Sequence, residues 1–228
     1  MRDKTEKAEQ NTSSRKNGQP KNRVKTNISQ GSTKEPKAAD LTAALRSAAE
    51  LNDVIHRFLR TRGAVFEAAA EAVAACLRDG GKIFLFGNGG SAAQAQHFAA
   101  ELVNGLSRRD SPPLPAVALT TDMSALTAIG NDRGFAEVFS RQVEALGWPG
   151  DVALGLTTSG TSPNILEGLR GARAKGMITI ALTGENTAAV GPLTDYVLDA
   201  PSCSTARIQE AHLFLLHELA RRLERASF

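Results

Sequence analysis

The residues of this 228-residue chain that could carry out chemistry gather around one glycine-rich stretch. The apolar run 83–86 predicts a buried strand, and Gly87-Asn88-Gly89-Gly90-Ser91, the glycine loop, follows it before a helix begins. The first turn of a helix has free N–H groups that bind anions such as phosphate. His97 and Glu101 lie four residues apart on this helix and therefore share one face. An anion-binding loop next to an imidazole and a carboxylate predicts a reaction centre.

A second polar loop contains five hydroxyl side chains in six residues. This hydroxyl loop consists of Thr157, Thr158, Ser159, Gly160, Thr161 and Ser162. Ser162 followed by Pro163 is a typical helix start, so the loop could be no more than a helix cap. Capping needs only one hydroxyl, however, whereas several hydroxyls and backbone N–H groups suit a phosphate monoester. The two loops together therefore favour a phosphate site.

The C-terminal segment adds Gln209, His212 and His217. Gln209 and His217 are separated by about 80° around a helix and about 12 Å along it. We therefore expect that one straight helix cannot bring both to a small centre. Either Gln209 acts at the start of the helix, or His217 serves a neighbouring subunit. His212 is predicted to be structural.

A dinucleotide site is the main alternative for the glycine loop, since Gly87-x-Gly89-x-x-Ala92 fits the formal pattern. That pattern also needs an acidic residue at the end of the second strand. The nearest candidate, Asp110, lies in a proline-rich stretch before that strand begins. The chain also contains no GKS or GKT phosphate-loop motif. Both points disfavour a nucleotide cofactor.

The elements around these loops alternate between short apolar runs and helical patterns. This alternation predicts an α/β fold with a doubly wound, five-stranded parallel sheet. In such sheets ligands bind beyond the carboxyl ends of the strands, where both loops fall. The strands are expected at 83–86, 116–120, 152–156, 177–182 and 196–199, and the helices between them at 91–106, 134–146 and 163–174.

Helices are also expected at both ends of the domain. Apolar residues recur at helical spacing from Asp40 to Phe58, and a second helix is expected from about Gly63 to Leu77. These two form a predicted N-terminal helical hairpin, whose use would be packing or oligomerisation. A C-terminal helix is expected over 205–225.

The chain divides into a polar tail, residues 1–37, and a domain, residues 38–228. The tail contains almost no large apolar groups, so we expect it to be disordered. Residues 1–40 contain ten basic and five acidic residues, and the remainder 17 and 19. The basic charge therefore comes from the tail, and the folded part gives no reason to expect nucleic-acid binding.

Composition also bears on location. The two cysteines, Cys76 and Cys203, form no disulfide framework, which is typical of a reducing cytosol. The start of the chain has no signal-peptide pattern, and no run approaches the length of a membrane span. We expect a cytoplasmic protein without membrane partners.

Four stretches, GNGGSAAQAQHFAAEL, AIGNDRGF, LTTSGTSPNIL and RIQEAHLFLLHEL, occur in the order and spacing of a known family. Over about Ala38 to Arg225 the chain resembles the phosphoheptose isomerases of the SIS (sugar isomerase) fold. The resemblance implies a homotetramer with sites at subunit interfaces. It implies conversion of sedoheptulose 7-phosphate to D-glycero-D-manno-heptose 7-phosphate, for which we expect an enediol route, in nucleotide-activated heptose biosynthesis.

The resemblance also implies roles for individual residues. Glu101 and His217 match the catalytic pair of the family. Residues that match its zinc site, described for some members, are His97, Glu101, Gln209 and His217. Residues that match its substrate contacts are Asn88, Gly89, Gly90, Ser91, Glu101, Asn131, Asp132, Thr157, Thr158, Ser159, Ser162 and Gln209. A His, Glu, Gln and His set is compatible with zinc but selects it weakly.

The chain departs from the family at three places. Ala206 stands where some members have Asp, the loop from Asn104 to Pro115 differs in length and charge, and residues 1–37 are additional. These departures concern the identity of the sugar more than the type of reaction. A branch of SIS proteins that binds a replication initiator without catalysis is the competing prediction. That branch lacks the acid–base pair, which is present here as Glu101 and His217.

Overall fold

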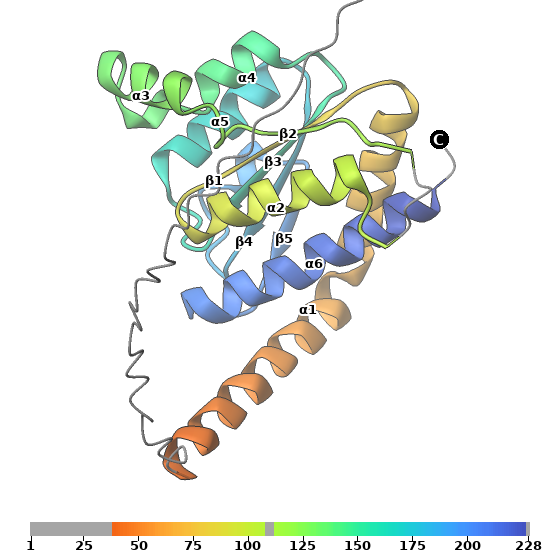
Figure 1. Cartoon of the computed structure of the whole chain (residues 1–228), viewed down its shortest axis with the longest axis vertical. Coiled ribbons are helices and arrows are strands. Elements are labelled where there is room, and N and C mark those ends of the chain that lie inside the picture. The colour runs from red at the N-terminus through yellow and green to blue at the C-terminus, as the bar shows by residue number, and fades with distance from the viewer. Residues whose placement is uncertain (1–37, 108–111, 227–228) are drawn as a thin grey trace, which may run out of the picture. The chain divides into compact units, whose positions relative to one another are not determined.

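The computed structural model describes residues 38–107 and 112–226. The predictions made for the tail, residues 1–37, and for the middle of the 104–115 loop fall outside these ranges. Within them, a five-stranded parallel sheet forms the centre of the domain, as predicted (Figure 1). Its strands are β1 (Ile83–Gly87), β2 (Ala116–Ala118), β3 (Val152–Thr157), β4 (Ile178–Thr183) and β5 (Tyr196–Asp199).

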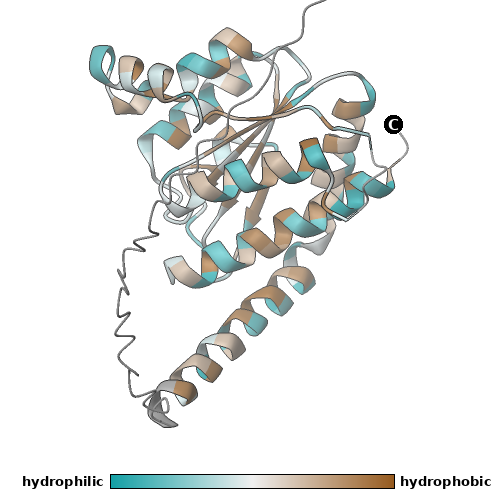
Figure 2. Cartoon of the chain, viewed as in Figure 1, coloured by the Kyte–Doolittle hydropathy of each residue, from teal (hydrophilic) through white to brown (hydrophobic). Residues whose placement is uncertain are grey.

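The strand order β2-β1-β3-β4-β5 places the reversal of the chain's path between β1 and β3. These two strands pair in register from Ile83 opposite Val152 to Gly87 opposite Leu156. Every residue of both is buried, which explains why they are apolar runs and do not alternate in polarity. The strands accordingly form a hydrophobic interior between more polar helices (Figure 2).

Helices cover both faces of the sheet (Figure 1). Ile83 and Leu85 pack on the face covered by α1 (Ala38–Arg78), α2 (Gly90–Asn104) and α6 (Thr205–Arg225). Phe84 and Phe86 pack on the opposite face, in a cluster with residues of α4 and α5. The helices of that side are α3 (Met123–Asp132), α4 (Ser140–Leu146) and α5 (Pro163–Ala174), with the short 3-10 helices η1 (Phe135–Glu137) and η2 (Gly191–Leu193).

The predicted N-terminal hairpin is wrong: the segment is helical, but α1 is one helix of 41 residues. The sequence predicts a second helix from about Gly63, yet a single glycine costs a helix only about 1 kcal/mol. Phe58 before it and Phe66 after it are both buried and their rings meet edge to face at 6.2 Å. Apolar packing therefore continues on one face of α1 past Gly63, and the free energy it contributes exceeds the cost of the glycine.

The segment between β2 and β3 also differs from the prediction. Helix α3 was not predicted, although Asp122 caps it by accepting a hydrogen bond from the Ala125 N–H at 2.9 Å. Among the described residues, none of those in α3 is buried, and the helix is only ten residues long. The predicted helix 134–146 is divided into η1 and α4. None of the described helices combines the length and apolar character that crossing a bilayer requires.

Candidate active site

The two predicted loops lie side by side, because they follow β1 and β3 at the point where the chain reverses. Two reciprocal hydrogen bonds between side-chain amides join the glycine loop to the start of α5. Asn88 Nδ2 donates to Asn164 Oδ1 at 2.9 Å, and Asn164 Nδ2 donates to Asn88 Oδ1 at 2.8 Å. Asn164 is only 2% exposed, so this pair fixes the glycine loop to the start of α5.

The backbone of the glycine loop allows other groups to approach it closely. Gly89 has φ +54°, a left-handed conformation that residues with a side chain rarely adopt. A Cβ on Gly90 would lie 2.6 Å from Gln209 Nε2, which places the Gln209 carboxamide directly over the loop. Ser91 is buried at the first turn of α2. The loop thus brings backbone N–H groups and the Gln209 amide to one place.

The hydroxyls of the second loop converge on Thr157. Its Oγ1 lies 3.4 Å from both Ser159 Oγ and Ser162 Oγ, and it accepts a hydrogen bond from the Gly160 N–H at 3.2 Å. Ser162 occupies the N-cap position of α5, as predicted. Within the described part of the chain, however, its hydroxyl caps none of the helix N–H groups. The helix-cap explanation therefore does not account for this hydroxyl, and the first turn of α5 stays available to an anion.

His97, Glu101 and His217 form an acid–base cluster between α2 and α6. His97 Nε2 lies 2.9 Å from His217 Nε2, and His97 Nδ1 lies 3.7 Å from Glu101 Oε1. The expectation that Gln209 and His217 cannot share one small centre is confirmed: His217 meets His97 of its own chain, whereas Gln209 lies over Gly90. The alternative in which His217 serves a neighbouring subunit is not needed to bring it to this cluster. Helices α2 and α6 run alongside each other (Figure 1), so His217 meets the middle of α2 while Gln209 meets its start.

Burial lowers the pKa of both histidines of α6, His212 and His217. Burial lowers the pKa of His217, the nearby His97 lowers it further, and the Glu101 charge acts in the opposite direction. Burial lowers the pKa of His212 to about 4. His212 Nε2 donates to the Thr183 carbonyl at 3.1 Å inside the core, which confirms the structural role predicted for it.

Two further predicted contacts, Asn131 and Asp132, lie at the end of α3. Both are exposed, and Asn131 Nδ2 donates to Asp132 Oδ1 at 2.7 Å. Next to them is a chamber of about 420 Å³ between the glycine loop and α3, with a largely apolar lining. Of the described residues, Asn88, Gly89 and Gly130 are among those that line it, whereas Asn131 and Asp132 are not.

The predicted zinc ligands are not assembled around one point. The two histidine Nε2 atoms face each other, but Glu101 lies toward the other nitrogen of His97 and Gln209 lies over Gly90. A catalytic zinc site uses three protein ligands. In the described ranges, no group of three or more His, Cys, Asp or Glu side chains is arranged to hold a metal. This conformation thus does not fit zinc, and the ligand set stays a prediction.

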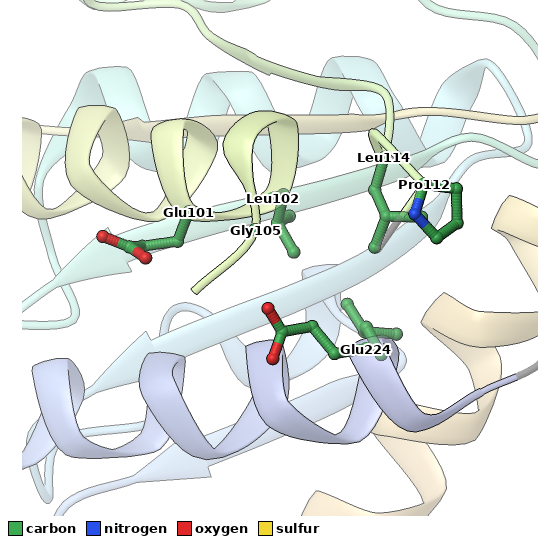
Figure 3. A pocket seen from close by; sticks show the side chains of 7 residues that line it. Glu101, Leu102, Gly105, Pro112, Leu114 and Glu224 are labelled. Carbon is green, nitrogen blue, oxygen red and sulfur yellow. The ribbon is translucent and has the colours of Figure 1, made fainter. Parts of the chain in front are cut away.

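A small cavity of about 10 Å³ borders the acid–base cluster (Figure 3). Glu101 of α2 and Glu224 of α6 lie near one side of it, and Leu114 and Pro112 at the other. Its volume suits a single water at most. The cavity lies between the C-terminal ends of α2 and α6 and is too small for a substrate.

Three residues near these loops were not predicted. Asn164 pairs with Asn88, Gln94 Nε2 donates to the Gln209 carbonyl at 2.6 Å, and Asn186 Nδ2 donates to the Ser159 carbonyl at 3.2 Å. Each connects segments far apart in the sequence. Of the three, only Asn164 could have been found from the sequence, because it directly follows the Ser162-Pro163 helix start and so lies next to the hydroxyl loop.

The comparisons with known proteins agree with this geometry. The SIS domain model matches residues 48–184. A phosphoheptose isomerase of Solidesulfovibrio magneticus is 54% identical over 172 residues, which cover 75% of this chain and 83% of the relative. The chain belongs to the phosphoheptose isomerase family of SIS-domain enzymes.

Other members of the family agree along most of their length. A phosphoheptose isomerase of Aquifex aeolicus is 55% identical over 155 residues, covering 68% of this chain and 81% of the relative. The solved structure of phosphoheptose isomerase GmhA from Neisseria gonorrhoeae superposes with a TM-score of 0.76 at 43% identity. That match covers 82% of this chain and 99% of the other. The SIS fold expected from the resemblance is thereby confirmed.

Proposed function

We propose that this member of the family interconverts sedoheptulose 7-phosphate and D-glycero-D-manno-heptose 7-phosphate, in the formation of nucleotide-activated heptose. The observation that carries the proposal is that one helix joins an acid–base cluster to two phosphate-suited loops. Helix α2 begins at the glycine loop and contributes His97 and Glu101. A sugar phosphate needs both functions in one site, because its reacting carbons and its phosphate lie at opposite ends of the molecule.

In the proposed mechanism Glu101 is the base that moves a proton between two neighbouring carbons. Its carboxylate removes a proton from C1 of the ketose, an enediol forms across C1 and C2, and the same proton returns to C2. His217 supplies a proton to the oxygen at C2 and accepts the one released from the oxygen at C1. Each such group contributes about 10²- to 10⁴-fold to the rate.

The lowered pKa of His217 supports this exchange of protons. A neutral imidazole can donate a proton from one nitrogen and accept one at the other. The His97 ring against His217 orients it, because one of the two facing Nε2 atoms must donate and the other accept. Zinc at His97, Glu101, Gln209 and His217 stays a prediction outside this mechanism.

The phosphate is proposed to bind between the two loops. The hydroxyls of Thr157, Ser159 and Ser162, with Thr158 beside them, would donate to its oxygens, together with N–H groups at the starts of α2 and α5. Ser91 would lie beside the phosphate, and Asn88, Gly89, Gly90 and Gln209 would contact the rest of the substrate. Binding a remote phosphate orients the reacting carbons and thereby lowers the barrier.

We further propose a homotetramer with sites at subunit interfaces, in the cytoplasm. Leu41 and Leu45 support an interface at α1, since these large apolar side chains are 58% and 64% exposed. Further along the same helix, apolar side chains such as Phe58 and Phe66 are buried against the domain. The exposed pair Asn131 and Asp132 would then contact substrate across such an interface. The competing non-catalytic role has no support from the cluster, where the acid–base pair is complete.

Incubation with sedoheptulose 7-phosphate tests the proposal, with the aldose product followed by chromatography. Parallel reactions with and without a chelator, and with zinc restored, test the zinc prediction. Formation of the aldose heptose phosphate is the expected result. Binding of the sugar phosphate without any product would instead favour the non-catalytic role.

A further inference from the structure

The hydroxyl loop packs against residues 183–186, which are the last residue of β4 and the segment that follows it. The two segments interlock through their glycines. Gly160 has φ +69°, and a Cβ there would clash with the Asn186 carbonyl oxygen. A Cβ on Gly184 would lie 2.6 Å from the Thr158 carbonyl oxygen. Each segment therefore presents a glycine to a carbonyl of the other, so the two backbones approach each other closely.

Hydrogen bonds connect this support to the core. Asn186 Nδ2 donates to the Ser159 carbonyl at 3.2 Å, and Thr183 Oγ1 donates to the Asn186 carbonyl at 3.4 Å. Thr183 is fully buried, and its own carbonyl accepts from His212 Nε2 at 3.1 Å and from the Ala200 N–H at 2.8 Å. A continuous series of contacts thus runs from α6 through the end of β4 to Ser159.

We propose that Asn186 is a positioning residue for phosphate binding, an inference that rests on the proposed function of the hydroxyl loop. Its side-chain N–H holds the Ser159 carbonyl on the side facing β4. This fixes the Ser159 peptide, so that the Ser159 hydroxyl stays beside Thr157 and Thr161. Asn186 itself touches no reacting atom, so it acts on the affinity for the phosphate group and not on the proton transfers.

The experiment compares Asn186→Ala with the wild type and with Asn52→Ala, a matched change at an exposed position of α1. Loss of one hydrogen bond corresponds to about a three- to tenfold change in an equilibrium constant. We expect Asn186→Ala to raise the KM for sedoheptulose 7-phosphate and the inhibition constant of inorganic phosphate by this factor. The kcat should stay within twofold, whereas a general structural defect would lower kcat and leave KM unchanged.

Hydrogen–deuterium exchange provides a readout that does not depend on catalysis. We expect the amides of residues 159–161 to exchange severalfold faster in Asn186→Ala, while those of α2 stay unchanged. If exchange in the loop is unchanged, or if KM and phosphate inhibition stay within twofold, Asn186 does not position the loop. If the wild type turns over no sugar phosphate, the proposed function fails, and the exchange measurement alone still decides whether Asn186 holds the loop.

Discussion

The hydroxyl loop and the acid–base cluster are built by different means. The hydroxyl loop is held by contacts that surround it: the end of β3, the start of α5 and the segment after β4. The acid–base cluster depends on how two helices pack, since His97 and Glu101 come from α2 and His217 from α6. The loop is defined by backbone shape, whereas the cluster is defined by titratable side chains.

The difference in construction matches the difference in proposed task. Phosphate binding requires many weak donors in fixed positions, and strand ends with interlocked loops provide them. Proton transfer requires few groups, each able to change protonation, and these stay partly exposed: the side chains of His97 and Glu101 are 42% and 21% exposed. Helix α6 connects the two regions. His217 lies in the cluster, and His212 donates to the Thr183 carbonyl beneath the hydroxyl loop.

The largest effect is expected from Glu101→Gln, which removes the proposed base and keeps the shape of the side chain. We expect kcat to fall by about 10²- to 10⁴-fold with little change in KM, because the phosphate region is untouched. Glu224→Gln is the matched control, since Glu224 lies on the facing helix beside the same small cavity (Figure 3). Steady-state kinetics of both variants decide the point. Activity of Glu101→Gln within a few-fold of the wild type would show that another group is the base.

His212 lies on α6 between Gln209 and His217, and it should make the stability of the domain depend on pH. Its folded pKa of about 4 lies below the unfolded value of 6.5, so the unfolded chain binds more protons between these pH values. This contribution to stability is complete above pH 6.5 and declines to a loss of about 3 kcal/mol at pH 4. His212→Gln, which can still donate to the Thr183 carbonyl, should remove this part of the pH dependence.

Urea unfolding at pH 7, 5.5 and 4.5 measures the difference between the two proteins. The free energies of unfolding of the wild type and His212→Gln should converge as the pH falls. Parallel pH profiles would mean that His212 is not kept neutral by burial.

Ser162→Ala separates phosphate binding from helix capping in the hydroxyl loop. Because the Ser162 hydroxyl makes no capping hydrogen bond among the described residues, we expect about a tenfold rise in KM with stability and kcat nearly unchanged. Ser204→Ala is the matched control, because Ser204 is the N-cap residue of α6 and its side chain likewise caps none of the described N–H groups. A loss of about 1 kcal/mol in stability at unchanged KM would restore the helix-cap explanation.

The smallest effect is expected at Gly63, where glycine serves neither region. A Cβ at Gly63 would meet nothing within 4 Å, and the residue lies inside α1. Gly63→Ala should therefore raise the free energy of unfolding by about 0.5–1 kcal/mol. Gly89→Ala should lower it, because φ at Gly89 is +54°. Urea unfolding of both variants measures this contrast, and destabilisation by Gly63→Ala would argue for a break in the helix there.

The sheet and the chemical character of the two loops could be predicted from the sequence. Continuous apolar runs such as Ile83 to Phe86 are diagnostic because a strand buried on both faces is mostly apolar along its whole length. The glycine and hydroxyl loops could be recognised because their chemistry is local: several glycines or several hydroxyls stand within six residues. The spacing of His97 and Glu101 placed them on one face for the same reason.

How distant segments meet could not be predicted, because it depends on packing across the domain. Whether α1 continues past Gly63 depended on Phe58 and Phe66 finding one common packing surface, which local propensity cannot show. The meeting of His217 with His97 depended on the relative placement of α2 and α6; the spacing along α6 alone showed only that Gln209 and His217 lie at different places. The support of Ser159 by Asn186 is likewise a contact across 27 residues. Local periodicity reports which face of an element is apolar, but the partner of that face is chosen by packing over the whole domain.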